Sequence, residues 1–286
     1  MIDRQAFFRA GFAFPHRVMS PADAGAARRE LEALLARWSD DPTLHRPLTD
    51  YCRANFHIVT RWGAEIARQP AILDAVEEVI GPDILCWMVE VILKEPGSGK
   101  MISMHQDFTY WGMADQDKGV TAWLALSDAT PENGCMQFVR ASHLQGQVAH
   151  EDTFAADNLL SRGQEIAVDY DPKDAVFCCL APGEISLHHS LMFHGSGPNR
   201  TEGRRIGIVL RYLSADMAHT KAGRDYALPV RGADRSGHFI HVAPPLADFS
   251  PESLALYDEI TEAQAAYFAE GAAEPPRYVE QATGAR

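Results

Sequence analysis

The chain has 286 residues, of which 46% are hydrophobic, so it is long enough to bury a large core. Its 26 Lys and Arg against 39 Asp and Glu give a formal net charge of −13, which repels nucleic acids and anionic membranes. No apolar run approaches the ~18 residues of a membrane span, so we expect a cytoplasmic protein with no nucleic-acid or membrane partner.

The N-terminal part is expected to be helical. Ser20-Pro21-Ala22-Asp23 supplies an N-cap, a proline at the first helical position and an acid at N3, which together predict a helix from there to about residue 39. Two shorter helices are predicted over 62–68 and 71–80. The segment 44–56 has no periodic pattern, so we expect a loop there, with a lid over the site as the alternative.

From residue 84 the pattern changes to one of strands and turns. Strands are predicted over 84–93, 101–107, 120–127, 135–139, 175–180, 185–189 and 205–213. Seven to nine strands without βαβ alternation predict a mainly β protein with flanking helices and a double-stranded β-helix core, the jelly-roll of cupin-like proteins. The segment 226–245 is expected to be irregular, and a last helix is expected to end near residue 270.

We expect one domain over residues 1–286. It would consist of a helical part (about 1–82), a jelly-roll core (about 83–214) and a C-terminal extension (about 215–286), because no repeat or linker interrupts the chain. The five cysteines follow no C-x-x-C spacing, which predicts reduced core residues rather than disulfides or zinc ligands.

Two stretches carry candidate metal ligands. His105 and Asp107 are two residues apart, and in an extended chain both side chains point to one face, where they can hold one metal ion. His194 offers a second histidine, although His188 and His189 compete for this role. Two histidines and one carboxylate form the facial triad of non-heme Fe(II) oxygenases.

Arg205 follows His194 by eleven residues and opens an apolar strand. A guanidinium is a natural bidentate partner for a carboxylate. Arg211 shares its face of the strand but lies about 20 Å farther along, so only one of the two reaches a given ligand. Arg204 points to the opposite face and is expected to form a surface ion pair.

Other candidates have two interpretations. Four aromatic or apolar residues follow His105-Gln106-Asp107 and contact either substrate or the core: Phe108, Tyr110, Trp111 and Met113. Three further histidines are expected to be structural or exposed: His143, His150 and His241.

Over about Ile84–Tyr212 the chain resembles the phytanoyl-CoA dioxygenase (PhyH) family of Fe(II)- and 2-oxoglutarate-dependent oxygenases. Four matches carry the resemblance: His105-Gln106-Asp107 with Tyr110-Trp111, Trp123, Asn133-Gly134-Cys135 with Ala141-Ser142-His143, and His194-Gly195-Ser196 with Asn199 and Arg205. Two elements depart from the family pattern, because Gly112 stands where a proline often follows Tyr-Trp, and Arg140-Ala141-Ser142-His143 replaces Pro-Gly-Ser-His.

The resemblance implies that His105, Asp107 and His194 are the catalytic iron ligands. It also implies that Arg205 holds the far carboxylate of 2-oxoglutarate, helped by Ser196 and Trp123. Related halogenases have a small residue in place of the carboxylate, so Asp107 implies hydroxylation with O2, releasing succinate and CO2. Desaturation or ring chemistry remains open.

The sequence does not identify the substrate or the oligomeric state. A small-molecule substrate is expected, and the −13 charge favours a compact polar metabolite over a CoA ester. Two rival functions stay open: a cupin-like metalloenzyme that does not use 2-oxoglutarate, and a non-catalytic β-sandwich binding protein.

Overall fold

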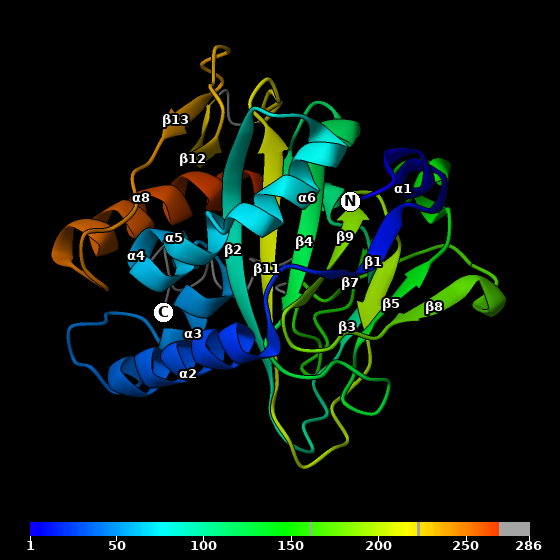
Figure 1. Ribbon diagram of the computed structural model, residues 1–286, viewed down its shortest axis with the longest axis horizontal. Coiled ribbons are helices and arrows are strands. Elements are labelled where there is room, and N and C mark those ends of the chain that lie inside the picture. The colour runs from blue at the N-terminus through cyan, green and yellow to red at the C-terminus, as the bar shows by residue number, and fades with distance from the viewer. Residues whose placement is uncertain (161, 222–223, 269–286) are drawn as a thin grey trace.

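A computed structural model describes residues 1–160, 162–221 and 224–268, apart from the side chains of Tyr110 and Ala266 (Figure 1). The described strands are β1 (Phe12–Arg17), β2 (Ile84–Lys94), β3 (Ile102–His105), β4 (Gly119–Ala125), β5 (Met136–Val139), β6 (His150–Asp152), β7 (Gln164–Ile166), β8 (Ala175–Cys178), β9 (Glu184–His189), β10 (His194–Ser196), β11 (Arg205–Ser214), β12 (Asp225–Arg231) and β13 (Phe239–His241). They confirm a mainly β fold with a jelly-roll core.

The strands form two facing sheets and a separate pair. The large sheet has the order β1-β9-β4-β11-β2-β12-β13, the small sheet has the order β3-β10-β5-β8, and β6 pairs with β7. Along β11, Ile206, Ile208 and Leu210 point to the outer face, where they join the main hydrophobic core. Arg205 and Arg211 therefore point to the inner face, toward the small sheet.

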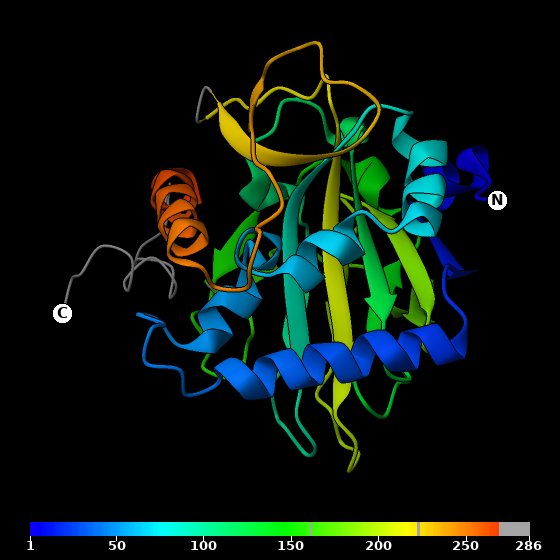
Figure 2. The same ribbon diagram turned by 60° about the vertical axis from the view of Figure 1, so that its left-hand side comes forward.

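Helices cover the outer face of the large sheet, as Figure 2 shows for α2 and α6. The described helices are α1 (Arg4–Ala10), α2 (Pro21–Trp38), α3 (Leu48–Arg53), α4 (Phe56–Val59), α5 (Arg61–Ala67), α6 (Pro70–Ile80), α7 (Phe108–Trp111) and α8 (Pro251–Phe268). The predicted cap of α2 is present, because the Ser20 side chain accepts a hydrogen bond from the Asp23 amide. None of these helices is long and apolar enough to cross a bilayer.

Two predicted loops contain regular structure. The segment 44–56 holds α3, where Tyr51 and Cys52 are buried, so tertiary packing supports a helix too short to show a periodic pattern. The segment 226–245 contains most of β12 and all of β13. Residues 269–286, where the last helix was expected to end, lie outside the described part of the chain.

The strand predicted over 101–107 ends early. β3 stops at His105, and Asp107 has helical angles (φ −59°, ψ −42°) because it precedes the short helix α7. The Phe108 amide donates to the Ser190 carbonyl at 2.9 Å, and Trp111 is buried against Trp87, which together hold the turn. His105 and Asp107 therefore reach the same place by a turn and not by strand alternation.

The cysteine prediction is correct in part. All five thiols are free, and four of them are buried, but Cys179 is exposed.

Candidate active site

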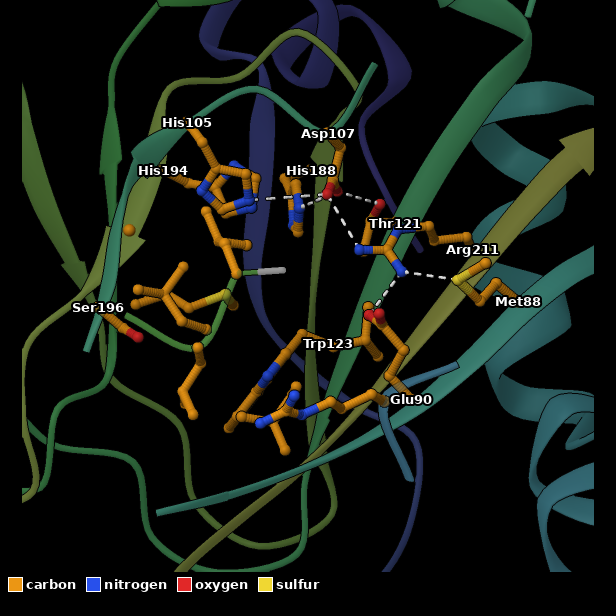
Figure 3. Close-up of a pocket in the computed structure, with 18 of the residues that line it drawn as sticks. Met88, Glu90, His105, Asp107, Thr121, Trp123, His188, His194, Ser196 and Arg211 are labelled. Carbon is orange, nitrogen blue, oxygen red and sulfur yellow. Dashed lines mark hydrogen bonds and ion pairs between the residues drawn. The ribbon is translucent and has the colours of Figure 1, made fainter. Parts of the chain in front are cut away.

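Three buried side chains form a possible metal-binding group between the sheets. His105 in β3 and His194 in β10 are paired across neighbouring strands, and their ring centroids lie 4.1 Å apart. Asp107 follows the end of β3 and turns toward both rings (Figure 3). One potential ligand atom from each residue lies within 4.8 Å of the others.

Both imidazoles are held in the tautomer that a metal needs. Nδ1 of His105 lies 2.9 Å from the Ser103 carbonyl, and Nδ1 of His194 lies 2.9 Å from the Met192 carbonyl. A carbonyl only accepts, so each Nδ1 donates and each Nε2 keeps its lone pair. Burial lowers the pKa of His105 to about 3 and that of His194 to about 4. Two neutral imidazoles and a carboxylate are a suitable set for Fe(II).

Asp107 is fixed by partners on the large sheet. Its Oδ2 accepts from Thr121 Oγ1 at 2.8 Å and lies 3.3 Å from His188 Nε2. Its Oδ1 accepts from Arg211 Nη2 at 3.1 Å and lies 3.8 Å from His105 Nε2. Burial alone would raise the pKa of Asp107, but Arg211 and the hydrogen bond with His188 hold it well below its usual range. Asp107 is therefore an anchored anion.

Arg211 bridges Asp107 to a second acid. Its Nη1 donates to Glu90 Oε2 at 2.5 Å, across the pairing of β11 with β2. Burial opposes the charge on Arg211, but Glu90 and then Asp107 raise its pKa. Thr121 and Glu90 were missed in the sequence. Thr121 could have been found from the alternation of side chains along its strand, because it lies two residues before Trp123 and therefore points to the same face.

Arg205 is a buried cation without an acid. It is 1% exposed, its guanidinium lies over the Trp123 ring at 5.2 Å, and its Nη1 donates to the Gly134 carbonyl. Burial lowers its pKa to about 10, which leaves it charged at neutral pH. Within the described part of the chain, no carboxylate oxygen lies within 4.0 Å of it. Gly207 makes room for this stack, since a Cβ there would lie 1.9 Å from the Trp123 ring.

Ser196 lines the same pocket but already has a protein partner. Its Oγ accepts from Lys94 Nζ at 2.6 Å, and Lys94 also donates to the Ser196 carbonyl at 3.2 Å. Burial and then Arg205 lower the pKa of Lys94 to about 6. In the described structure the Ser196 hydroxyl has no side-chain hydrogen bond other than the one with Lys94, so it retains capacity for a further hydrogen bond to a ligand. Lys94 was missed because it looks like the polar end of an apolar strand.

The metal-binding group, Ser196 and Arg205 line a single pocket. Its empty volume is about 1100 Å³, which includes the space at its open mouth. Its lining includes the metal-binding group, Thr121, Trp123, His188, Ser196, Arg205 and Arg211, together with Trp87, Trp111 and Phe268. His189 instead lies 3.0 Å from Asp117, and Arg204 pairs with Glu95 on the surface at 3.0 Å.

The remaining candidates lie outside this lining. Met113 is buried in a neighbouring cluster, and Phe108 packs against that cluster. The other histidines have protein partners: His143 contacts the Phe8 carbonyl, His150 the Val148 carbonyl, and His241 the carboxylate of Asp234. The Tyr110 side chain is outside the described part of the structure.

Comparisons with known proteins show which proteins this chain is similar to. Human peroxisomal phytanoyl-CoA dioxygenase is 32% identical over 151 residues, covering 51% of this chain and 44% of that protein. The apo structure of the non-heme monooxygenase ThoJ is 33% identical with a TM-score of 0.83, covering 93% of this chain and 97% of that one. CytC3 with Fe(II) and α-ketoglutarate shares the fold, at 20% identity and a TM-score of 0.62, over 87% of this chain and 95% of that one.

These matches confirm the family expected from the sequence, and the CytC3 structure shows a neighbouring protein of the same fold with iron and α-ketoglutarate bound. The aligned region spans about half the length of the curated relatives. The family model for phytanoyl-CoA dioxygenase (PhyH) matches residues 7–207, which is more than half of the chain. The chain therefore belongs to the phytanoyl-CoA dioxygenase family.

Proposed function

We propose that the protein is an Fe(II)- and 2-oxoglutarate-dependent dioxygenase that hydroxylates a small-molecule metabolite and releases succinate and CO2. The observation that carries this proposal is Arg205, a buried guanidinium without a carboxylate partner in the described structure, in the same pocket as two histidines and an aspartate. Burying a charge without a partner is costly, so such a site favours a ligand that brings its own anion. A metalloenzyme that does not use 2-oxoglutarate has no need of this cation.

In this proposal the residues have separate tasks. His105, Asp107 and His194 hold the iron, which when bound supplies the site where O2 reacts. Thr121 and His188 contact one oxygen of Asp107, and the other oxygen, which accepts from Arg211, lies 3.8 Å from Nε2 of His105. A protein that restrains its ligands in this way keeps the remaining coordination positions open.

Arg205 holds the far carboxylate of 2-oxoglutarate. Ser196 donates a further hydrogen bond, and Trp123 keeps the guanidinium in place by stacking on it. We also propose that residues 1–286 form one catalytic domain, because residues of α3, both sheets and α8 line the pocket.

The test is anaerobic addition of Fe(II) and 2-oxoglutarate to the metal-free protein. The visible absorption spectrum is then recorded to look for a charge-transfer band. A band that requires both components supports the proposal. A response to metal alone supports the cupin-like alternative, and no metal binding supports the β-sandwich binding protein.

Arg205→Met is expected to retain iron but to weaken 2-oxoglutarate binding by about 2–5 kcal/mol, because the cosubstrate loses a buried charged partner. Arg204→Met is the matched control, since this nearby arginine forms a surface ion pair with Glu95. Unchanged 2-oxoglutarate affinity in Arg205→Met would show that Arg205 does not bind the far carboxylate of 2-oxoglutarate.

A further inference from the structure

The pocket lining contains a third arginine, Arg53, for which the proposed reaction has no task. It is the last residue of α3 and is half-buried. In the described part of the protein, its guanidinium has no hydrogen bond and no carboxylate within 4.0 Å. Asp50 lies three residues earlier on the same helix, where helical neighbours often pair, yet the two form no ion pair.

The charges of the pocket leave Arg53 unmatched. Arg211 is neutralised by Glu90 and Asp107, which it contacts directly. In the proposed complex, two positive charges of Fe(II) balance the two carboxylates of 2-oxoglutarate. Arg205 and Arg211 are then balanced by Glu90 and Asp107, so among the described charged residues that line the pocket Arg53 remains unbalanced. Asp50, outside this lining, attracts Arg53 without forming an ion pair with it.

The surroundings of Arg53 indicate the rest of the ligand. Ala54, the next residue in the chain, packs against a cluster that contains Trp87, Trp111 and Phe268, and these three aromatic residues also line the pocket. The two tryptophan rings lie 5.5 Å apart, and Phe268 lies 6.2 Å from Trp87. Such walls stabilise an apolar or aromatic body, while a single cation fixes one end of it.

We propose that Arg53 binds the carboxylate of the primary substrate, which is a monoanionic small molecule with an apolar or aromatic body. A guanidinium binds a carboxylate through two parallel hydrogen bonds. One guanidinium balances a carboxylate but not the several phosphates of a CoA ester. The compact polar metabolite preferred from the sequence is thereby replaced by an amphipathic acid. This inference rests on the proposed function, which assigns the charges of iron and 2-oxoglutarate.

The test uses matched probes: a series of phenylalkanoic acids with two to five chain carbons, and the primary amide and the primary amine of each. The anaerobic protein is first loaded with Fe(II) and saturating 2-oxoglutarate, which occupies Arg205. Binding is followed by quenching of tryptophan fluorescence, to which Trp87 and Trp111 contribute, and by the change in the charge-transfer band. Failure to form the band refutes the proposed function, whereas the comparison among probes tests Arg53.

At least one acid is expected to bind about tenfold to a hundredfold more tightly than its amide, because a hydrogen-bonded charge is added. Arg53→Gln should remove this preference, Arg53→Lys should keep part of it, and Arg53→Glu should favour the amine. Arg204→Gln is the control and should behave as the wild type. Equal binding of acids and amides, a preference that survives in Arg53→Gln, or no binding by any acid would overturn the inference.

Discussion

The buried ion pairs of Arg211 allow a quantitative test of the site's architecture. The side chains of Arg211 and Glu90 are 14% and 17% exposed, and that of Asp107 is 3% exposed. Replacing Arg211 with Met fills similar space but leaves two buried carboxylates without their cation. Breaking a buried pair in this way costs about 3–5 kcal/mol of folding free energy.

Arg204 provides the matched control. Its pair with Glu95 joins the residue before β11 to the residue after β2, but the two side chains are 39% and 52% exposed. Exposed pairs contribute about 0–1 kcal/mol, so Arg204→Met is expected to cost no more than that.

The assay is urea unfolding of metal-free protein, followed by both tryptophan fluorescence and circular dichroism to check that the transitions coincide. Adding Glu90→Gln to Arg211→Met should recover part of the lost stability, because one of the two unpaired charges is removed. A loss below about 1 kcal/mol in Arg211→Met, or a loss equal to that of the control, would refute the view that Arg211 neutralises the pocket.

Three further predictions concern single residues. Asp107→Ala is expected to lose most of its iron and its succinate formation, even with chloride added, because the site has lost its anionic ligand; full iron loading would contradict this. His194→Ala should lose iron, whereas His188→Ala should retain it, as iron analysis after anaerobic reconstitution will show; the reverse order would exchange their roles. Burial lowers the pKa of His57 to about 3, so below pH 6.5 this residue contributes about 1.4 kcal/mol per pH unit to the fall in unfolding free energy, in addition to the contributions of His105 and His194. In His57→Leu the dependence of the unfolding free energy on pH should be smaller by about 1.4 kcal/mol per pH unit. An unchanged pH dependence between pH 7 and 5 would refute the lowered pKa of His57.

The sequence was sufficient for the features that depend on local pattern. The cap at Ser20 marked the start of α2, and the change to strand periodicity located the start of β2 at Ile84. The alternation in β11 placed Arg205 and Arg211 on the inner face, where both line the pocket. These predictions succeed because they need only the residues within one element.

Local pattern failed where packing decides the structure. α3 has six residues and α7 has four, which is too short for a helix to be stable by itself in water. α7 is important for the site, because the turn between β3 and α7 directs the Asp107 side chain toward His105 and His194. The expected strand alternation gave the right neighbours for the wrong geometric reason.

The partners of Asp107 could not be derived from spacing at all. Thr121, His188 and Arg211 lie 14, 81 and 104 residues away from it, on three different strands. They meet because β9, β4 and β11 are adjacent in the large sheet, with His188 opposite Thr121 and Thr121 opposite Arg211.

Alternation determines which face each of these side chains takes, but only the strand order makes them neighbours. A slip of one residue in β11 would turn Arg211 toward the helices and bring Leu210 into the pocket. The apolar outer face of β11, with Ile206, Ile208 and Leu210 packed in the main core, opposes that slip. The charge network around Asp107 is therefore held in register by hydrophobic residues on the opposite side of the same strand, and a search for polar motifs does not include them.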